Sequence, residues 1–327
     1  DKVCPKKKDL IMACGEIISA AVMASYIEAQ GIKAEAMTGF QAGIVTTADF
    51  GNADIMKVDF VPITEKLKEG KVVVVAGFQG RTEKDEITTL GRGGSDTTAV
   101  VLGGDLKADL VEIYTDVPGI AVTDPRIVPE APFIPNISFD EVIAMAENGA
   151  KVVHPRAVRA AKEFNIPLRI KSTFDEGDGT LVGPEESELT ISGISLQKDL
   201  TIAKFTGQKE FADGEIKKLL GLSRDGVVYS NDTGERVIII DEDQKGAVKN
   251  LAEELRTEHE ICENMSKVST VYKDTVGSKS INQKITALLF AEKIPIVALK
   301  AVNNCNTCII KSGYAEKSVR AIFKGYF

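Results

Sequence analysis

A glycine-rich turn between an apolar run and a helix-forming stretch constrains this chain most. Residues 91–98 read Gly-Arg-Gly-Gly-Ser-Asp-Thr-Thr, with the apolar run 72–78 before them and Ala-Val-Val-Leu at 99–102 after them. A glycine-rich turn that opens a helix presents unpaired backbone N–H groups to an anion. The turn also carries one fixed cation, Arg92, and one fixed anion, Asp96. The segment therefore predicts a site for a small zwitterion or a phosphate.

Length and charge limit the classes of protein to consider. The chain has 327 residues, enough for two domains and a large core, and its hydrophobic content of 43% and charged content of 27% are typical of globular proteins. The net charge of −8 disfavours a nucleic-acid partner. We find no apolar run of the roughly 18–20 residues that a membrane span needs, and residues 1–8 lack the apolar stretch of a signal peptide. We therefore expect a cytoplasmic protein without a membrane partner.

The cysteines favour the same compartment. An odd number of thiols without a secretion signal indicates reduced cysteines, which are Cys4, Cys14, Cys262, Cys305 and Cys308. The last two form a single C-x-x-C, and zinc would need two further ligands, whereas His154 and His259 are the two histidines of the sequence. We interpret the pair as incidental thiols on a strand or turn, with a metal or redox role as the alternative. We predict no metal site made by side chains.

The first half of the chain alternates between two periodicities. The helix-like segments are 9–31, 96–106, 139–148 and 156–164, and the strand-like segments are 31–37, 72–76, 110–114, 151–153 and 168–171. In the first helix, Leu10, Ile11, Ile18 and Val22 are among the apolar residues at helical spacing. Ser138 and Glu141 have the spacing of a capping box. This alternation predicts a layered α/β domain with a mostly parallel sheet.

The second half follows a polar, turn-rich segment, residues 175–188, which we interpret as a linker. Strand-like segments follow at 201–205, 226–230, 236–240, 268–273, 296–300 and 307–311, and helix-like segments at 210–220, 244–257, 281–293 and from 315 onward. The pattern predicts two small α+β units, each too small to bury much surface alone.

Four blocks of sequence, in the same order, resemble the signatures of aspartate kinases, a branch of the amino-acid kinase superfamily. The blocks lie at 13–21, 91–99, 114–126 and 149–155, and the resemblance extends over about residues 6–182. It implies a three-layer αβα amino-acid kinase fold, N-terminally incomplete, over residues 1–185. The looser C-terminal part lies where the family carries tandem ferredoxin-like ACT domains, here residues 186–327. The resemblance implies a homodimer or higher homo-oligomer formed through these ACT domains.

The resemblance assigns an amino-acid end to the site. Arg92 resembles the guanidinium that holds the α-carboxylate of aspartate, for which a bidentate fork is suited. Glu16 resembles the carboxylate that meets the substrate ammonium, and Asp96 assists it or organises the site. Phe78 and Ser95 are weaker candidates for lining the same pocket. The structural alternatives are a surface arginine, a solvated helix glutamate and, for Asp96, an N-cap of the following helix.

The resemblance also assigns a nucleotide end. Thr115 and Asp116 follow a strand, where open α/β sheets bind ligands, and Asp124, Arg126 and Lys151 complete the stretch that meets ATP in the family. Arg126 and Lys151 resemble the cations on its phosphates. The alternative for Asp124, which precedes a proline, is a turn residue. We interpret His154, also before a proline, as a structural residue at a helix start.

The implied reaction is the ATP-dependent phosphorylation of the side-chain carboxylate of L-aspartate to 4-phospho-L-aspartate, the first step toward lysine, threonine and methionine. A carboxylate is ionised near pH 7 and needs no general base. Mg²⁺ would be held mainly by the nucleotide phosphates and water. Two alternatives remain: a non-catalytic, amino-acid-binding regulatory chain of the same family, and an amino-acid kinase with a different acidic substrate.

The sequence also departs from the family pattern. Family members begin with a strand and a Lys-Phe-Gly-Gly turn that grips the transferred phosphoryl group, and this chain has no such segment. On the order of a hundred residues are expected to be missing from the front, so we expect little kinase activity from this chain alone. The loop at 206–214 resembles an effector-binding ACT loop only weakly. Feedback by lysine or threonine is therefore implied by the family alone.

Overall fold

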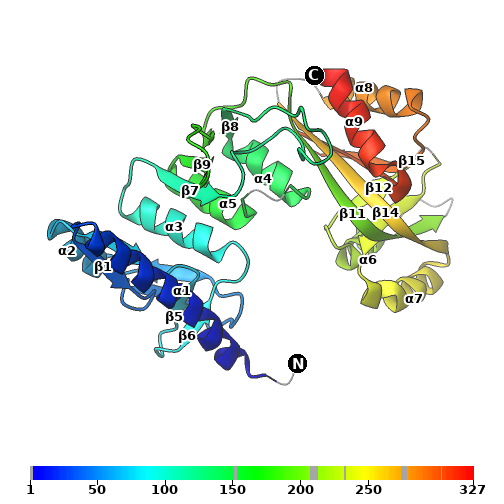
Figure 1. Cartoon of the computed structure of the whole chain (residues 1–327). Helices are drawn as coiled ribbons and strands as arrows, with labels where there is room; N and C mark the ends of the chain where they lie inside the picture. Colours follow the sequence, from blue (N-terminus) through cyan, green and yellow to red (C-terminus); the bar gives the residue numbers. More distant parts are fainter. Residues whose placement is uncertain (1–2, 151–152, 207–212, 232, 274–277, 303) are drawn as a thin grey trace. The chain divides into compact units, whose positions relative to one another are not determined.

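Contacts divide the chain into two compact units. The computed structural model describes residues 3–150, 153–206, 213–231, 233–273, 278–302 and 304–327 (Figure 1). The first unit comprises Asp1–Gly119, Pro135–Ile143 and Lys151–Glu185, and the second comprises Ile120–Ile134, Ala144–Ala150 and Glu186–Phe327. That these units are the kinase domain and the ACT domains predicted with a boundary after residue 185 stays a prediction.

The first unit is a mixed α/β structure, and its sheets contain parallel strand pairs (Figure 1). Its helices are α1 (Pro5–Ala29), α2 (Val61–Lys68), α3 (Gly94–Asp105), α4 (Phe139–Glu147, which continues into the second unit) and α5 (Pro155–Phe164). Its strands are β1 (Ala34–Met37), β2 (Ile44–Thr46), β3 (Ile55–Val58), β4 (Val72–Val75), β5 (Gln79–Arg81), β6 (Ile87–Thr89), β7 (Val111–Thr115), β8 (Asn136–Ser138), β9 (Leu168–Ser172) and β10 (Thr180–Gly183). The mixed α/β fold class is thus confirmed.

Strand pairing follows the predicted parallel pattern only in part, because β2 and β3, and also β5 and β6, pair antiparallel, and one segment is misassigned. Strand β1 pairs in parallel with β4, β7 with β9 and β8 with β10, whereas β9 and β10 are antiparallel. The other sheet has the order β3-β2-β5-β6. The prediction that 175–188 is a linker is wrong over part of its length, because β10 lies inside that range and bonds to strands on both sides. The predicted strand at 151–153 lies largely outside the described residues.

Helix α1 forms as predicted but turns a different face inward. Its buried residues are Asp9, Ala13, Ala20 and Ala24, whereas Ile11 is 70% exposed and Val22 is 64% exposed. Small side chains therefore let the helix lie close to its neighbours, and its large apolar side chains point outward.

The same helix corrects the expectation that no segment is long enough to span a membrane. Helix α1 has 25 residues with a mean hydropathy of 1.8 over its most apolar window, which meets the length and composition of a span. A single such helix is weak evidence, because core helices of soluble proteins pass the same test.

Buried Asp9 ties α1 to the segment that leads into the glycine-rich turn. Asp9 is 1% exposed, and its carboxylate accepts from the Thr89 backbone N–H at 2.8 Å, the Thr89 hydroxyl at 3.0 Å and the Gly51 N–H at 2.9 Å. Thr89 ends β6, two residues before Gly91. One carboxylate thus fixes the start of α1 against the approach to the turn.

We expect Asp9→Ala to lower the free energy of unfolding by about 3 kcal/mol, because the change leaves buried donors without an acceptor. Urea denaturation measures this loss. The matched control is Asp49→Ala, an exposed aspartate of the same unit, which should change stability by less than about 0.5 kcal/mol. Equal effects of the two substitutions would contradict the anchoring role.

The second unit is built on one closed sheet. Its strands are β11 (Ile191–Thr206), β12 (Val228–Ser230), β13 (Arg236–Ile240), β14 (Glu258–Tyr272), β15 (Ile296–Val302) and β16 (Cys305–Lys311), in the order β11-β13-β12-β15-β16-β14. Its helices are α6 (Asp213–Leu222), α7 (Lys245–Leu255), α8 (Ser278–Ala291) and α9 (Ala315–Tyr326). The order β11-α6-β12-β13-α7-β14 is the ferredoxin-like order of elements.

The two predicted α+β units are fused rather than separate. Strands β11 and β14 pair with each other from Ile191–Tyr272 to Thr206–Glu258, so each runs through both halves of the sheet. One buried cluster draws on both halves and contains Leu200, Ile202, Tyr229, Val237, Ile239, Met265, Ala298 and Ile309. The prediction that each half buries little alone agrees with this shared core only in part, because a second buried cluster, around Ala203, Phe205 and Ile238, belongs to the first half alone.

The C-x-x-C lies on a strand. Cys305 is 9% exposed and Cys308 is 1% exposed, both on β16. Burial raises the pKa of both thiols, that of Cys308 to about 12. All five cysteines are free. Protonated, buried thiols of this kind are poor nucleophiles and poor metal ligands, which favours the structural interpretation.

Candidate functional site

The glycine-rich turn begins α3 with a left-handed residue. Gly93 is the N-cap, with φ 68°, and Gly91 has φ 73°. A Cβ at Gly93 would lie 2.2 Å from the Cβ of His154. Only glycine satisfies both the backbone angle and this close contact. The interpretation of Asp96 as N-cap is therefore wrong, because Asp96 lies in the first turn of the helix.

Phe78 approaches the turn in a strained conformation. Its φ is 68°, a region that costs a bulky residue of order 1–3 kcal/mol. Its backbone N–H donates to the Thr98 hydroxyl at 3.0 Å, and its carbonyl accepts from the Leu90 N–H at 2.9 Å. These bonds hold Phe78, directly before β5, against Thr98 on α3 and against Leu90, which precedes the turn.

Arg156 fixes the residue that precedes the turn. Its guanidinium donates to the Leu90 carbonyl at 2.8 Å, to the Ala53 carbonyl at 2.6 Å and to the Asp54 carboxylate at 2.6 Å. Five N–H donors in a rigid plane suit such a three-way junction. Arg156 follows His154 in the chain, and His154 is the N-cap of α5, with Nδ1 accepting from the Arg156 backbone N–H at 3.3 Å. The prediction that His154 is a structural residue at a helix start is confirmed.

Arg92 and Asp96 differ in their surroundings. Arg92 is exposed, and it makes no hydrogen bond or ion pair with another residue in the part of the chain that the structure describes. Asp96 is half-buried. Burial raises the pKa of Asp96, whereas His154 opposes this rise through its charge and a backbone hydrogen bond. Burial likewise lowers the pKa of His154. The turn thus combines a free guanidinium with a partly desolvated carboxylate.

We expect Asp96→Asn to stabilise the unliganded protein at pH 7. A carboxylate whose folded-state pKa is raised costs stability when ionised, and the cost disappears as the pH falls toward the unfolded value of about 3.9. The gain should therefore shrink between pH 7 and pH 4 in urea titrations. Asp109→Asn, at an exposed aspartate, serves as the control. A gain that is constant with pH would argue against this electrostatic cause.

Glu16 and Ser95 line one cavity of about 460 Å³ in the first unit. Its remaining lining is largely apolar: Ile63, Leu67, Val73, Val75, Gly77, Thr98, Ala99, Leu102 and Leu106. Glu16 is half-buried on α1, and Ser95 lies in the first turn of α3. The fold thus brings two of the predicted substrate residues, 79 positions apart, to the same hollow.

The predicted nucleotide residues are distributed over both units. Thr115 ends β7, and its hydroxyl donates to Asp116 at 3.1 Å. Asp124 and Arg126 belong to the segment 120–134 of the second unit. Arg126 donates to Asp124 at 2.6 Å, and this pair lowers the pKa of Asp124. Lys151 lies outside the described residues.

Asp124 also organises a turn, which is the alternative role that the sequence predicted for it. Its carboxylate accepts from the Arg126 backbone N–H at 2.9 Å, and its carbonyl accepts from Ile127 at 2.8 Å and Val128 at 3.1 Å. The Arg126 side chain is nevertheless 88% exposed. A turn role and a phosphate-facing cation are compatible.

The sequence alone did not indicate the residues that fix the turn. Asp9, Thr98 and Arg156 act through partners 20 to 103 positions away, so no local pattern indicates them. Among the described residues, no group of three or more His, Cys, Asp or Glu side chains is arranged to hold a metal ion.

Comparison with known proteins defines the class. Residues 2–172 match the amino acid kinase family. The chain is 43% identical over 225 residues to the aspartokinase of Geobacillus stearothermophilus, and 35% identical over 306 residues to Aspartokinase 1 of Bacillus subtilis. These alignments cover 68% and 90% of this chain. Together they show that the chain belongs to the aspartokinases of the amino acid kinase family.

Solved structures agree with this assignment. Escherichia coli aspartokinase III, in complex with aspartate and ADP, matches 99% of this chain with a TM-score of 0.80 and 25% identity. The same protein in complex with lysine and aspartate matches with a TM-score of 0.76 and 25% identity. The chain spans 55% of the length of the Geobacillus relative, 76% of Aspartokinase 1 and 76% of aspartokinase III.

Proposed function

We propose that the chain takes part in the transfer of the γ-phosphoryl group of ATP to the side-chain carboxylate of L-aspartate. The observation that carries the proposal is the turn at 91–96, which holds an exposed arginine, without a partner among the described residues, beside the N-terminus of α3. Such a turn is suited to a carboxylate ligand. The complex of aspartokinase III with aspartate and ADP supports the same substrates.

The proposed roles divide the substrate between three side chains. Arg92 holds the α-carboxylate through a bidentate pair. Glu16, at the cavity wall, meets the α-ammonium group. Asp96, half-buried near His154, orients the ammonium or its surroundings, and Phe78 and Ser95 line the pocket. The side-chain carboxylate is then the nucleophile, and it needs no general base.

The nucleotide end rests on the family resemblance. Thr115 and Asp116 would lie near the nucleotide, with Asp124 beside them in sequence, and Arg126 and Lys151 would neutralise phosphate charge. Mg²⁺ bound through the phosphates would offset the charge that develops during transfer. The chain's own contribution is to position the two substrates.

The experiment that tests the proposal separates binding from turnover. Titration calorimetry with L-aspartate, D-aspartate and L-glutamate measures the amino-acid site. Trapping of the acyl phosphate with hydroxylamine, in the presence of ATP and Mg²⁺, measures turnover by this chain and by an N-terminally extended version. We expect selective L-aspartate binding by both chains and much faster turnover by the extended one.

Each other outcome has a distinct meaning. Binding without turnover by either chain would favour the non-catalytic regulatory alternative. Stronger binding and turnover of L-glutamate would favour a different acidic substrate. Absence of binding and turnover from both chains would refute the proposal.

Regulation, assembly and location belong to the same proposal. The lysine complex of aspartokinase III supports an amino-acid effector, and we propose lysine or threonine, acting through the ACT-like second unit. We expect a homodimer or higher homo-oligomer, which light scattering measures; a monomer would count against it. Five free cysteines are consistent with the reducing cytoplasm.

A further inference from the structure

His154 lies between the glycine-rich turn and the start of α5. Its side chain packs directly on Gly93, because a Cβ on that glycine would lie 2.2 Å from the Cβ of His154 and 2.5 Å from its Cγ. Gly93 follows Arg92 and is the N-cap of α3. His154 is itself half-buried. The residue therefore forms part of the surface that supports the turn.

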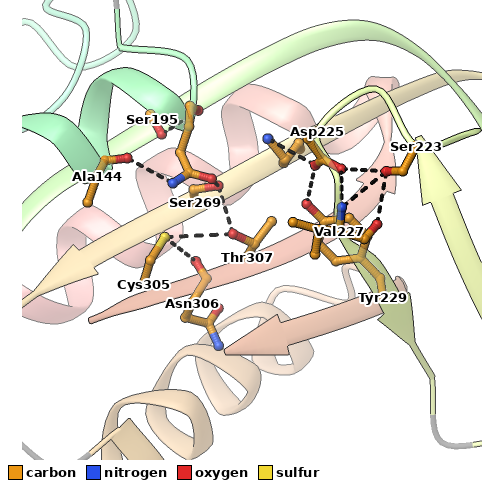
Figure 2. Close-up of polar contacts among 12 residues, drawn as sticks. Ala144, Ser195, Ser223, Asp225, Val227, Tyr229, Ser269, Cys305, Asn306 and Thr307 are labelled. Carbon is orange, nitrogen blue, oxygen red and sulfur yellow. Dashed lines mark hydrogen bonds and ion pairs between the residues drawn. The ribbon is translucent and has the colours of Figure 1, made fainter. Parts of the chain in front are cut away.

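The backbone of His154 reaches the carboxylate of Asp96. Its N–H donates to that carboxylate, and no other hydrogen bond reaches the Asp96 side chain from the residues that the structure describes. A carboxylate with a structural role differs from this: Asp225 in the second unit accepts from two hydroxyl groups and a backbone N–H (Figure 2). Asp96 therefore keeps acceptor capacity for a substrate ammonium group, and His154 helps to set the position of its carboxylate.

The imidazole of His154 caps α5 only in its unprotonated form. Nδ1 accepts from the Arg156 backbone N–H at 3.3 Å, and a protonated imidazole has no acceptor nitrogen. Protonation therefore removes the side-chain cap at this helix start. The Arg156 guanidinium holds the Leu90 carbonyl, directly before the turn, at 2.8 Å. A change at the cap thus acts on a residue that also fixes the approach to the turn.

The charges around His154 favour this unprotonated form at neutral pH. Three cations and one anion act on the ring, one pair from the turn and α3 and one pair from α5: Arg92, Asp96, Arg156 and Arg159. Burial and the three cations lower the pKa of His154, and Asp96 opposes this. When the ring does become protonated, its best partner is the carboxylate of Asp96, which then competes less well for a substrate ammonium group.

We propose that His154 is a positioning residue of the aspartate site, which holds Asp96 and the turn in their binding geometry while its imidazole is neutral. The inference rests on the proposed function, because it assumes that Arg92 and Asp96 meet L-aspartate. Protonation pairs the imidazolium with Asp96 and releases the α5 cap, so both substrate contacts of the turn are weakened. By linkage, L-aspartate binding should in turn disfavour protonation of His154.

Calorimetry with L-aspartate from pH 7.5 to pH 5 tests this role. We expect the parent chain to lose affinity at least about fivefold over that range, the size of effect that follows from loss of one cap. His154→Asn keeps an acceptor for the cap but has no titrating ring. It should bind within about twofold of the parent at pH 7.5 and lose the pH step. His154→Ala, without an acceptor, should bind at least about fivefold more weakly at pH 7.5.

The matched control is His259→Asn, which changes an exposed histidine on β14 and should retain the pH step of the parent. NMR titration of the unliganded chain adds a readout that needs no substrate. The sequence has two histidines, so His259→Asn also assigns the ring signals. The amide signals of Gly93, Asp96 and Arg156 should shift with the midpoint of the His154 ring, and that midpoint should lie below the ordinary value of about 6.5.

Several results would overturn the proposal. These are a parent affinity that does not change with pH, a pH step that persists in His154→Asn, and turn amides that do not follow the His154 ring. If His154→Ala fails to fold, the comparison of the parent with His154→Asn decides. No L-aspartate binding by the parent at pH 7.5 refutes the proposed function instead, and the amide titration then decides whether His154 sets the geometry of the turn.

Discussion

Replacement of Arg92 by alanine is expected to weaken L-aspartate binding about 100-fold, equivalent to roughly 3 kcal/mol. The guanidinium is exposed and without a described protein partner, so its loss should leave the fold intact and remove a bidentate contact. Lysine supplies the charge but not the planar fork, so Arg92→Lys should recover only part of the affinity. Calorimetry with L-aspartate measures both variants.

The control for Arg92 is Arg159→Ala, an exposed arginine on α5 that also acts electrostatically on His154. It should change aspartate affinity by no more than about twofold, which corresponds to about 0.4 kcal/mol. Circular dichroism and urea denaturation confirm that both variants are folded. Aspartate affinity of Arg92→Ala equal to that of the parent chain would show that Arg92 does not hold the substrate.

Replacement of Gly93 by alanine should give the second large effect, a loss of at least about 3 kcal/mol of stability. Left-handed backbone costs a residue with a side chain about 1–2 kcal/mol, and the new Cβ would also meet His154 at 2.2 Å. Displacing His154 moves the N-cap of α5 and disturbs the turn that carries Arg92. We therefore expect L-aspartate affinity to fall together with stability.

Gly70→Ala separates these two causes. Gly70 has φ 73°, close to that of Gly93, but a Cβ there meets nothing within 4 Å. The Gly70→Ala variant should lose about 1–2 kcal/mol of stability, the cost of a left-handed backbone at a residue with a side chain, and should keep its aspartate affinity. Urea denaturation and calorimetry measure both variants. Equal losses in the two would mean that the contact with His154 contributes nothing.

Elements with local signals were predicted well. Ser138 and Glu141 form the expected reciprocal bonds at the start of α4, with the Ser138 N–H donating at 2.9 Å and the Glu141 N–H at 3.2 Å. The turn at 91–94 likewise depends on glycines that the sequence displays. Such features need only neighbouring residues, so the sequence shows them directly.

Elements that depend on distant partners were missed. Strand β10 lies in a polar, glycine-rich segment, and only pairing with β8 and β9 makes it a strand. Helix α1 was predicted, but its buried face was not. Contact with neighbouring elements buries its small residues, whereas the spacing of its large apolar residues predicted that those would be buried. In the site, Asp9 and Arg156 hold the turn through contacts that no spacing reveals. The roles of the site residues stay predictions, and Lys151 lies outside the described residues.

The continuous strands β11 and β14 have a consequence for how the second unit loses its structure. The closed sheet leaves neither half a free edge, and both halves share two strands and one buried cluster, although the first half also has a buried cluster around Ala203, Phe205 and Ile238. The unit should therefore melt in a single cooperative transition, and a chain cut between the halves should yield no stable fragment. A structural change in one half should therefore also displace the other half, because β11 and β14 run through both.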